Sequence, residues 1–465
     1  MKQMSLQHIA AACHGTFHGD AALLSKEITG VAIDSRKVEP GFLFVPIKGA
    51  RVDGHTFIPQ VMEKGALVTL SEQTLENHSY PYILVSSCEQ ALKDIAAFYL
   101  DVLNIPVVGI TGSVGKTSTK ETIASILSQK YKVLKTEGNY NNEIGLPLTI
   151  FNLTEEHEVA VLEMGIDHPG EMHRLAAIDR PDIMVITNIG LAHLENFGTR
   201  EGTLKAKTEC FDHLKPNATV ILNGDDDKLC TVSSVQGKAP VFFGLSDKHP
   251  AYADEIDDKG LLGTDCTLHL SIGTVRVHIP VPGIHMVYNA LAGSCVGISM
   301  GLSLEEIKSG LSSLKTIAGR LNLIDTGSIL IIDDCYNANP VSTMASIDTL
   351  ATATGRKIAV LGDMFELGPN ENELHYNTGA HASQKDIDVI CCIGALSKHT
   401  YDGAKAFAKT SAVLYFETKQ EFLEKISNVI VTGDTILVKA SNGMKFTEIV
   451  DTLKEIELPA NQEEL

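Results

Sequence analysis

The chain has 465 residues, of which 44% are hydrophobic and 21% charged, a composition typical of globular α/β enzymes and sufficient for about three domains. Its formal net charge of −20 at pH 7 excludes a non-specific grip on nucleic acid or on an anionic membrane, because both would repel it. The polar start and the lack of apolar runs near about 18 residues predict neither a signal peptide nor stable membrane insertion. The nine cysteines lack metal-type spacing and indicate a reducing compartment, so we expect a cytoplasmic protein.

Residues 1–104 carry short apolar runs separated by turn residues, which predicts a small mixed α/β domain. Two of these runs are Gly41–Pro46 and Tyr82–Ser86. The section contains no nucleotide-binding motif, so any nucleotide site must lie further along the chain.

The segment Gly109–Ser118 is a glycine-rich turn that ends in Gly-Lys-Thr, a pattern suited to a nucleotide triphosphate. It follows the apolar run 106–110 and precedes 116–131, where apolar residues recur at helical spacing. In such a strand–loop–helix unit the backbone N–H groups and the helix N-terminus face phosphate oxygens, Lys116 reaches the outer phosphates, and Thr117 ligates magnesium. Ile110 stands where the strict pattern has glycine, so the loop is a variant. The predicted nucleotide contacts in this loop are Gly112, Ser113, Gly115, Lys116, Thr117 and Ser118.

From residue 105 to 318, short β-branched runs alternate with helical segments, which predicts a mainly parallel sheet. One run ends in Glu163 and another leads into His193. Ligands bind beyond the carboxyl ends of parallel strands, so we expect Thr117, Glu163 and His193 near the phosphates, where they suit magnesium. Histidine is an unusual magnesium ligand, and a capping or packing role for His193 is an equal alternative. By spacing alone, Lys207 is an ordinary solvated helix lysine.

Two further features precede the third section. A helix that starts near Gly283 places His285 and Asn289 four residues apart on one face, which is compatible with recognition of a base edge. A capped helix with a buried Asn289 is an equal alternative. Arg320 lies at the expected domain boundary, from which an arginine can reach a terminal phosphate when domains close, although an isolated arginine is usually a surface charge.

Residues 319–465 repeat the alternation of strands and helices, which predicts a second, Rossmann-like doubly wound sheet. Its predicted strands are 329–333, 357–362, 389–393, 412–416 and 435–439. The acidic end from Glu455 to Leu465 is expected to be a frayed tail. The predicted fold is therefore α/β with three domains: a small mixed domain (1–104), a central P-loop-type domain with a mainly parallel sheet (105–318), and a Rossmann-like domain (319–465).

These motifs resemble those of the ATP-dependent Mur ligases, and the resemblance runs from end to end. It rests on Asp34–Arg36, Gly49–Phe57, Gly109–Thr119, Asn139–Asn142 with Ile144–Pro147, Glu163–Gly165, Asn188–His193, Asp333–Pro340 and Asp363–Gly368. At an Ala-Lys-x-Glu segment the family carries a lysine whose carbamate helps to hold the second metal, and Lys207 matches it. Two positions depart from the family: Lys439–Asn442 stands where Lys-Gly-Ser-Arg is usual, and Cys335 where serine is common.

The resemblance implies an ADP-forming amide ligase of peptidoglycan precursor synthesis. It is strongest to the member that joins D-alanyl-D-alanine to UDP-N-acetylmuramoyl-tripeptide. That reaction transfers the γ-phosphoryl group of ATP to the tripeptide's terminal carboxylate, and the dipeptide amine then attacks the acyl phosphate. The implied cofactors are ATP, two Mg²⁺ ions and a carbamylated Lys207, in a monomer without a nucleic-acid partner.

The resemblance also implies roles for individual residues, with the UDP-sugar on the first domain and the incoming dipeptide on the third. The implied catalytic residues are Lys116, His193, Lys207 and Arg320. The implied metal ligands are Thr117, Glu163, His193 and Lys207. The nucleotide contacts implied beyond the phosphate loop are His285, Asn289, Arg320 and Asp334. The implied substrate contacts are Ser35, Arg36, Asp53, His55, Asn141, Asn142, Asn337 and Asn339.

Three alternatives stay open: another Mur-type amino-acid ligase, a P-loop ATPase or kinase that makes no amide, and a catalytically silent nucleotide-binding protein. The sister enzyme that adds the third residue typically carries an Asp-Asn-Pro-Arg segment, which this chain lacks. A ligase, unlike an ATPase, releases ADP only with both a UDP-muramoyl peptide and an amine. Intact Lys116, Glu163, His193 and Lys207 argue against a silent protein.

Overall fold

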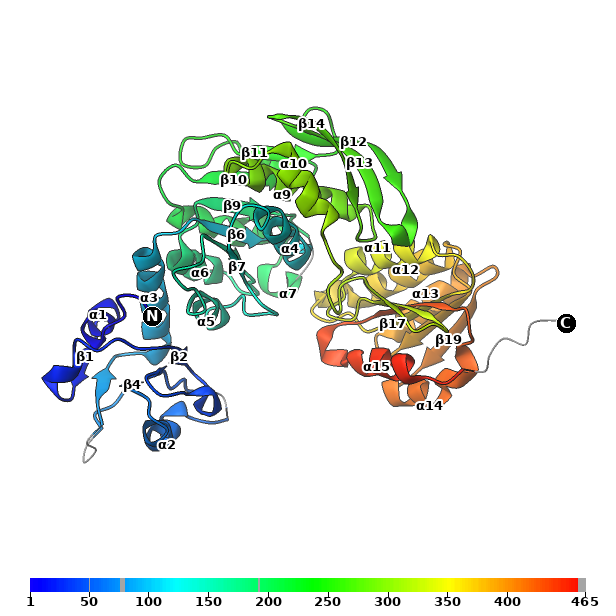
Figure 1. The fold of residues 1–465 in the computed structure, drawn as a ribbon. Coiled ribbons are helices and arrows are strands. Elements are labelled where there is room, and N and C mark those ends of the chain that lie inside the picture. The colour runs from blue at the N-terminus through cyan, green and yellow to red at the C-terminus, as the bar shows by residue number, and fades with distance from the viewer. Residues whose placement is uncertain (50, 76–79, 191–192, 459–465) are drawn as a thin grey trace.

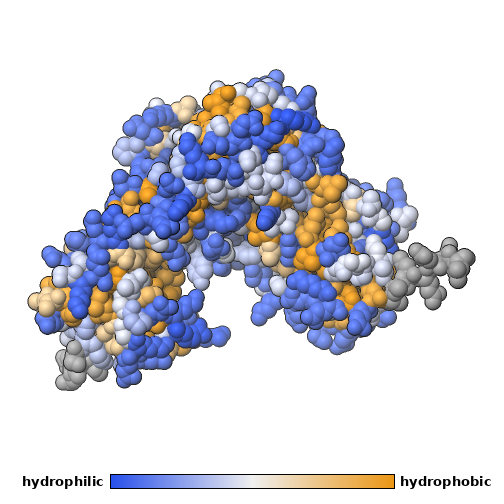
Figure 2. All heavy atoms as spheres, viewed as in Figure 1, coloured by the Kyte–Doolittle hydropathy of each residue, from blue (hydrophilic) through white to orange (hydrophobic). Residues whose placement is uncertain are grey.

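The structure is a computed structural model that describes residues 1–49, 51–75, 80–190 and 193–458. Three parts of the sequence predictions fall outside these ranges: residue 50 of a substrate segment, residues 191–192 of a metal segment, and residues 459–465 of the expected tail. The chain forms three α/β bodies in an arch, with the central one at the top (Figure 1). In the space-filling view the first and third bodies stand apart below it, and mostly hydrophilic side chains line the gap (Figure 2).

The first body is built on a five-stranded sheet of order β1-β5-β4-β3-β2, in which only β1 is antiparallel to its neighbour. This agrees with the small mixed domain that the sequence predicts. The strands are β1 (Thr16–His18), β2 (Val31–Ala32), β3 (Leu43–Phe44), β4 (Val68–Ser71) and β5 (Tyr82–Leu84). The helices are α1 (Leu6–Ala12), η1 (Ala21–Leu23), η2 (Ser35–Lys37), η3 (Gly54–Phe57), α2 (Ile58–Glu63) and α3 (Cys88–Leu103).

The central body is built on a nine-stranded sheet of order β14-β13-β12-β11-β10-β9-β6-β8-β7. The strands are β6 (Val107–Thr111), β7 (Val133–Lys135), β8 (Val159–Glu163), β9 (Ile183–Ile186), β10 (Thr219–Asn223), β11 (Val241–Gly244), β12 (Ala251–Asp258), β13 (Thr264–Leu270) and β14 (Gly273–Ile279). The helices are α4 (Lys116–Leu127), α5 (Gly145–Ile150), α6 (Glu171–Asp179), α7 (Leu194–Phe197), α8 (Arg200–Thr208), η4 (Glu209–His213), η5 (Leu229–Thr231), η6 (Gly260–Leu262), α9 (His285–Ser299) and α10 (Leu304–Ser312).

Most of this sheet is parallel, as predicted, but β12, β13 and β14 form an antiparallel extension that the sequence analysis missed. Residues along β13 alternate between buried and half-buried, which is the period of two expected when one face of a strand is covered. The turn between β12 and β13 carries η6, which reaches the third body near its helix α11 (Figure 1).

The third body is built on a six-stranded sheet of order β15-β16-β20-β17-β18-β19, parallel except for the edge strand β15. The doubly wound prediction is therefore confirmed. The strands are β15 (Asn322–Asp325), β16 (Leu330–Asp333), β17 (Lys357–Gly362), β18 (Val389–Ile393), β19 (Ala412–Phe416) and β20 (Thr435–Lys439). The helices are α11 (Pro340–Ala351), η7 (Gly368–Asn370), α12 (Glu371–Ser383), α13 (Ser397–Phe407), α14 (Lys419–Val429), η8 (Asn442–Met444) and α15 (Thr447–Glu455).

The first and central bodies share one hydrophobic core, whereas the third body has its own cores. One core runs without a break from the first body through α3 into the face of the central sheet that α5 and α6 cover. A second core lies under α4, α9 and α10 on the opposite face. The third body has separate cores of its own on the two faces of its sheet. Helix α3 therefore joins the first two bodies as a shared structural element.

Candidate active site

The phosphate loop connects β6 to α4 and needs glycine at two positions. Gly112 has φ of +150°, and a Cβ there would lie 1.9 Å from the Thr187 hydroxyl oxygen, so no side chain fits. Gly115 has φ of +84°, a left-handed conformation that favours glycine, immediately before the helix starts at Lys116. These two glycines therefore allow the tight turn that leads from β6 into α4.

The loop is held in shape by residues that follow β9. The Asn188 side chain accepts a hydrogen bond from the Val114 N–H at 3.0 Å and donates one to the Val114 carbonyl at 2.9 Å. The Thr187 hydroxyl also donates to that carbonyl, and Gly190 N–H donates to the Ser113 hydroxyl at 2.8 Å. Asn188 was expected at the end of a strand, in a segment that resembles a magnesium site, but its part in holding the phosphate loop was not predicted, and no role was predicted for Thr187.

Lys116 and Thr117 begin α4, and both residues are half-buried. The Lys116 ammonium donates to the Gly112 carbonyl at 2.8 Å, so it lies back over the loop. Burial lowers its pKa and the nearby Arg320 lowers it further, while the Glu163 charge opposes both. The Thr117 hydroxyl makes no hydrogen bond within the described part of the chain, which leaves its oxygen available to a cation.

Glu163 ends β8 with its carboxylate almost fully buried. Its Oε1 accepts a hydrogen bond from the Asn141 amide at 2.8 Å. Its Oε2 is buried and has no hydrogen-bond partner among the described residues. An unpartnered buried acceptor is costly, so this oxygen fits coordination to a hard cation such as magnesium.

His193 lies at the junction of the central and third bodies. Its Nδ1 is 2.8 Å from a carboxylate oxygen of Glu366, but not in hydrogen-bonding geometry. Burial lowers the pKa of His193, and the positive charges of Lys116 and Lys207 add to this effect while Glu366 opposes it. A lowered pKa favours the neutral imidazole, which is the form that can ligate a metal.

Lys207 is only 3% exposed on α8, so it is not the solvated helix lysine that spacing alone favoured. Its ammonium has no hydrogen bond and no ion pair within the described ranges. Burial, together with repulsion from Lys116, lowers its pKa far below the usual lysine value. By contrast, the equally buried Lys439 is paired with Asp334 at 2.6 Å. Lys207 is therefore a buried amine without a counter-ion, close to the other candidate ligands.

The third body contributes Arg320 and Tyr336 to the site. The guanidinium of Arg320 stacks over the Tyr336 ring at 4.1 Å from the ring centroid. The electrostatic influence of Arg320 on Lys116, and of Glu163 on Tyr336, places both side chains toward the phosphate loop. Arg320 also lines a small pocket together with Ser118 of α4. Tyr336 was missed by the sequence analysis, since one aromatic residue within a motif carries no functional signal by itself.

Asp334, an expected nucleotide contact, is occupied by bonds within its own domain. Its Oδ2 accepts from Lys439 and from Ser346, both at 2.6 Å, and its Oδ1 accepts from the Leu321 N–H at 3.2 Å. The carboxylate therefore holds the chain just after Arg320. A direct nucleotide contact by Asp334 stays a prediction.

His285 and Asn289, the pair predicted to recognise the edge of a nucleotide base, have different surroundings. Asn289 is buried, and its oxygen accepts a hydrogen bond from the Thr119 hydroxyl at 2.9 Å, which ties α9 to α4. The structure therefore favours the alternative of a buried asparagine. His285 is half-buried, and burial lowers its pKa against the opposing charge of Asp334. His285 thus faces the third body, and its contact with a nucleotide base stays a prediction.

The substrate contacts expected in the first domain have different surroundings. Arg36 has a side chain 86% exposed and pairs with Asp34 at 2.7 Å, which lowers the pKa of Asp34 to about 2. The His55 side chain is 7% exposed, and both of its ring nitrogens are used: Nδ1 donates to Asp53 at 2.7 Å and Nε2 accepts from the Glu72 N–H at 3.1 Å. The exposed Arg36 is free to meet a ligand, whereas His55 and Asp53 hold the loop. The carbonyl of Ser35 accepts a bond from Lys64.

The four asparagines expected to contact substrate do not gather at one point. Asn141 touches Glu163, as described above. The Asn142 oxygen accepts from the Gly145 N–H at 2.8 Å and so helps to begin α5. The Asn339 side chain caps α11, and Asn337 is exposed in the loop before it. Only Asn141 is therefore brought to the candidate metal ligands.

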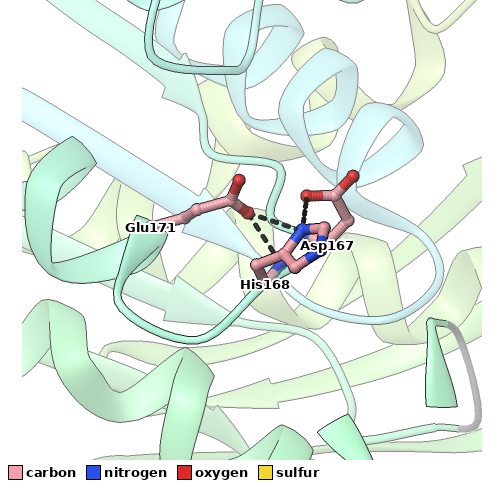
Figure 3. A group of neighbouring side chains, drawn as sticks. All are labelled: Asp167, His168 and Glu171. Atoms are coloured by element: carbon pink, nitrogen blue, oxygen red, sulfur yellow. Dashed lines mark hydrogen bonds and ion pairs between the residues drawn. The ribbon is translucent and has the colours of Figure 1, made fainter. Parts of the chain in front are cut away.

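A second acidic group lies on the loop after β8, where Asp167, His168 and Glu171 approach one another (Figure 3). One Glu171 oxygen accepts the backbone N–H groups of Asp167 and His168 at 2.8 Å each, and His168 Nδ1 lies 2.9 Å from Asp167. These bonds order the turn that leads into α6. They account for the group without a metal ion.

Comparisons with known protein families agree along the whole chain. Residues 27–108 match the model "Mur ligase family, catalytic domain", residues 110–297 match "Mur ligase middle domain", and residues 319–442 match "Mur ligase, glutamate ligase domain". The UDP-N-acetylmuramoyl-tripeptide--D-alanyl-D-alanine ligase of Bacillus subtilis is 40% identical over 433 residues, covering 92% of this chain and 93% of that protein. Its Escherichia coli counterpart is 36% identical over 432 residues, with coverage of 92% and 94%.

Solved structures give the same result. A crystal structure of MurF from Acinetobacter baumannii superposes with a TM-score of 0.90 at 32% identity, covering 97% of this chain and 99% of that one. MurF from Thermotoga maritima in complex with ADP superposes with a TM-score of 0.81 at 31% identity, covering 92% and 97%. Folylpolyglutamate synthase of Mycobacterium tuberculosis, at 15% identity and a TM-score of 0.61, shares the fold alone.

Proposed function

Since the chain belongs to the Mur ligase family, we propose that it is the ADP-forming ligase that joins UDP-N-acetylmuramoyl-tripeptide to D-alanyl-D-alanine in peptidoglycan precursor synthesis. The observation that carries this proposal is the convergence of four groups at one sheet edge. The phosphate loop and Glu163 lie at the carboxyl ends of β6 and β8, and His193 follows β9. The buried amine of Lys207 on α8 is close enough to Lys116 and His193 for their charges to affect one another.

The chemistry asks the protein to bring two anions together. A carboxylate is a poor electrophile, so the tripeptide carboxylate first receives the γ-phosphoryl group of ATP, and the dipeptide amine then displaces phosphate from the acyl phosphate. No enzyme nucleophile is needed. Lys116 neutralises the transferring phosphoryl group, and Arg320 adds a second cation from the third domain. When bound, magnesium supplies further neutralisation of phosphate charge, held by Thr117, Glu163 and His193.

Lys207 serves this site best as a carbamate. A neutral amine adds carbon dioxide to give a carbamate anion and releases one proton, and the low pKa of Lys207 provides the neutral amine. The product replaces a buried amine without a partner by an anionic oxygen ligand close to Lys116. The carbamate would be one further oxygen ligand for a second magnesium ion at this site.

Substitution of Lys207 tests the carbamate. Lys207→Ala should lose most activity and recover part of it when short carboxylic acids fill the vacated space. Lys207→Arg should be inactive and not rescued, because it keeps the charge but cannot form the carbamate. The exposed Lys205 on the same helix gives the matched control, Lys205→Ala, which should be fully active. Full activity of Lys207→Arg would exclude the carbamate.

The division of labour among the domains follows from the same proposal. The first domain would hold the UDP-sugar, the central one ATP, and the third the dipeptide. Among the described residues no helix is long and apolar enough to cross a membrane, and all nine cysteines are free thiols. The free thiols agree with the reducing conditions of the cytoplasm. We further propose that the enzyme is a monomer whose product serves the cell wall, and through it cell shape and division.

Phosphate release tests the function directly. It should be measured with ATP across a panel of UDP-muramoyl peptides and amine donors. We expect release only when UDP-N-acetylmuramoyl-tripeptide and D-alanyl-D-alanine are both present. Release without an amine would support the ATPase alternative, and release with a single amino acid in place of the dipeptide would indicate another Mur-type ligase.

A further inference from the structure

A cluster of three charges ties the first domain to the loop beside the candidate metal site. The carboxylate of Glu143 lies between Lys93 of α3, at 2.5 Å, and Arg174 of α6, at 2.6 Å. Lys93 is only 6% exposed, and the Glu143 side chain is 18% exposed. Burial raises the pKa of Glu143, but the hydrogen bonds from Arg174 and Lys93 outweigh that effect and lower it, so the carboxylate stays charged. Three elements that are distant in sequence therefore meet at one carboxylate.

Glu143 belongs to the loop between β7 and α5 that carries Asn141. The Asn141 amide donates to Glu163 Oε1 at 2.8 Å, and its carbonyl accepts from the Gly165 N–H at 2.8 Å. A Cβ at Gly165 would lie 2.8 Å from the Asn141 amide nitrogen, so the contact leaves no spare room. Asn141 thus occupies one oxygen of Glu163 and leaves the other, Oε2, unpartnered and buried. The orientation of that free oxygen depends on where the loop is held.

We propose that Glu143 is a positioning residue for the reaction: with Lys93 and Arg174 it fixes the loop that presents Asn141 to Glu163, and so sets the direction of the carboxylate oxygen that receives the metal. The inference rests on the proposed function for the role of that metal. It assigns to helix α3 a part in the chemistry, because the helix that belongs to the substrate-binding domain also anchors the metal-site carboxylate. Loss of the anchor acts on metal affinity through Asn141, without contact between Glu143 and substrate.

The test uses the full-length protein and Mn²⁺ as the probe, since free Mn²⁺ can be followed by its paramagnetic resonance signal in the presence of ADP. Glu143→Gln should raise the Mn²⁺ concentration for half-saturation about tenfold, the lower range found when a group that orients a metal ligand is lost. Glu143→Asp keeps the charge and should recover part of the affinity. The Mg²⁺ concentration needed for half-maximal phosphate release should rise by the same factor, with little change in the KM for ATP.

A buried acid–base pair in the third domain provides the matched control. Asp434 is paired with Arg356 at 2.8 Å and lies far from the metal ligands along the third sheet. Asp434→Asn should lower thermal stability and leave Mn²⁺ affinity unchanged. If Glu143→Gln also lowers stability but binds Mn²⁺ as the wild type does, the cluster is only a structural clamp and the inference is overturned.

Two further variants keep the outcome decisive. Arg174→Gln leaves the Lys93–Glu143 pair intact, so it should fold even if Glu143→Gln does not, and it should weaken Mn²⁺ binding by a smaller factor; unchanged binding would overturn the inference. Glu163→Gln should abolish the specific Mn²⁺ site. If Glu163→Gln binds Mn²⁺ normally, the metal-site assignment itself fails, which separates failure of the proposed function from failure of the positioning role.

Discussion

The two joints of this molecule are built differently. Between the first and central domains, α3 contributes buried side chains to one continuous core, and the Tyr99 hydroxyl donates to the Leu153 carbonyl at 2.8 Å across the joint. Between the central and third domains the cores are separate. This second joint consists of a linker with left-handed residues at Gly319 and Leu321, the packing of Leu261 of η6 against the third domain, and the approach of Glu366 to His193.

The difference between the two joints indicates which domain stays fixed and which domain moves during the reaction. An acyl phosphate must be protected from water, so a domain has to close over it after substrates bind. The joint with the shared core is unsuited to that motion, because moving it would expose apolar surface. The joint made by a linker and small contacts is suited to it. We therefore expect the UDP-sugar domain to stay fixed and the third domain to move, carrying Arg320 and Tyr336.

The largest expected effect comes from cutting the chain at each joint. Residues 319–465 should fold alone, since their cores are self-contained. A fragment of residues 105–318 should not, because it lacks the large buried side chains of α3. These are Leu92, Ile95, Tyr99 and Leu100. At about 2 kcal/mol each, their loss removes roughly 8 kcal/mol, comparable to the whole stability of a domain.

Circular dichroism and cooperative thermal unfolding of the two fragments provide the measurement. A fragment of residues 87–318, which keeps α3, serves as the control and should recover folding. Cooperative unfolding of the 105–318 fragment would contradict the claim that the first joint is a shared core.

The next effect concerns the phosphate loop, which lies at the junction of the rigid and mobile parts. Lys116→Ala removes a positive charge from the outer phosphates and should reduce turnover by about 100-fold or more, the usual result of losing one electrostatic stabiliser. Steady-state phosphate release with both substrates measures it. Lys132→Ala, an exposed lysine beyond the end of α4, should have normal turnover. Near-normal turnover in folded Lys116→Ala protein would refute the role of the loop.

The strands of the parallel sheets could be predicted closely from the sequence. The runs 159–163, 357–362 and 389–393 coincide with β8, β17 and β18. Such strands are covered on both faces, so they appear as unbroken apolar, β-branched runs. The antiparallel β12–β14 extension was missed because its strands carry polar residues at alternate positions and resemble connecting loops.

Only part of the candidate site could be predicted from the sequence. The phosphate loop and Glu163 follow from local pattern, since each ends a predicted strand. The burial of Lys207 does not, because it depends on tertiary packing: α8 packs against α6, α7 and η4, and Lys116 of α4 is close to the Lys207 amine. The anchoring role inferred for Glu143 likewise depends on contacts with Lys93 and Arg174, 50 and 31 positions away.

A smaller effect is expected inside the shared core. Asp179 is buried there, and neither carboxylate oxygen has a hydrogen-bond partner in the part of the chain that the structure describes. Burial raises its pKa well above the ordinary value despite the opposing charge of Lys215. Asp179→Asn should stabilise the protein at neutral pH by about 1–3 kcal/mol, because asparagine is neutral without taking up a proton and each unit of raised pKa corresponds to about 1.4 kcal/mol. Denaturant unfolding measures the difference.

The raised pKa of Asp179 determines whether the stability of the protein rises or falls with pH. Because the pKa of Asp179 is higher in the folded protein, the native state holds more protons than the unfolded state between about pH 4 and that raised value, so the stability of the wild type falls as the pH rises through this window. The advantage of Asp179→Asn should therefore shrink as the pH falls toward 4. A pH-independent difference would show that Asp179 is already ionised or solvated.

The smallest effect is expected at the mobile joint. Leu261→Ala trims one apolar contact of η6 with the third domain and should weaken docking by about 1 kcal/mol, which raises protease cleavage within 313–321 about fivefold. The adjacent Leu262 is 76% exposed, so Leu262→Ala should have no effect. Equal cleavage of the two variants would mean that η6 does not restrain the third domain.

Distances between spin labels test the central claim most directly. The exposed Cys230 is first replaced by serine, and labels are then attached at exposed positions, either Glu63 and Lys238 across the first joint or Lys238 and Lys405 across the second. UDP-N-acetylmuramoyl-tripeptide and a non-hydrolysable ATP analogue are then added. If the third domain moves and the first stays fixed, the whole distribution of Lys238–Lys405 distances should shift, and the distribution of Glu63–Lys238 distances should not change. A shift across the first joint with none across the second would contradict it.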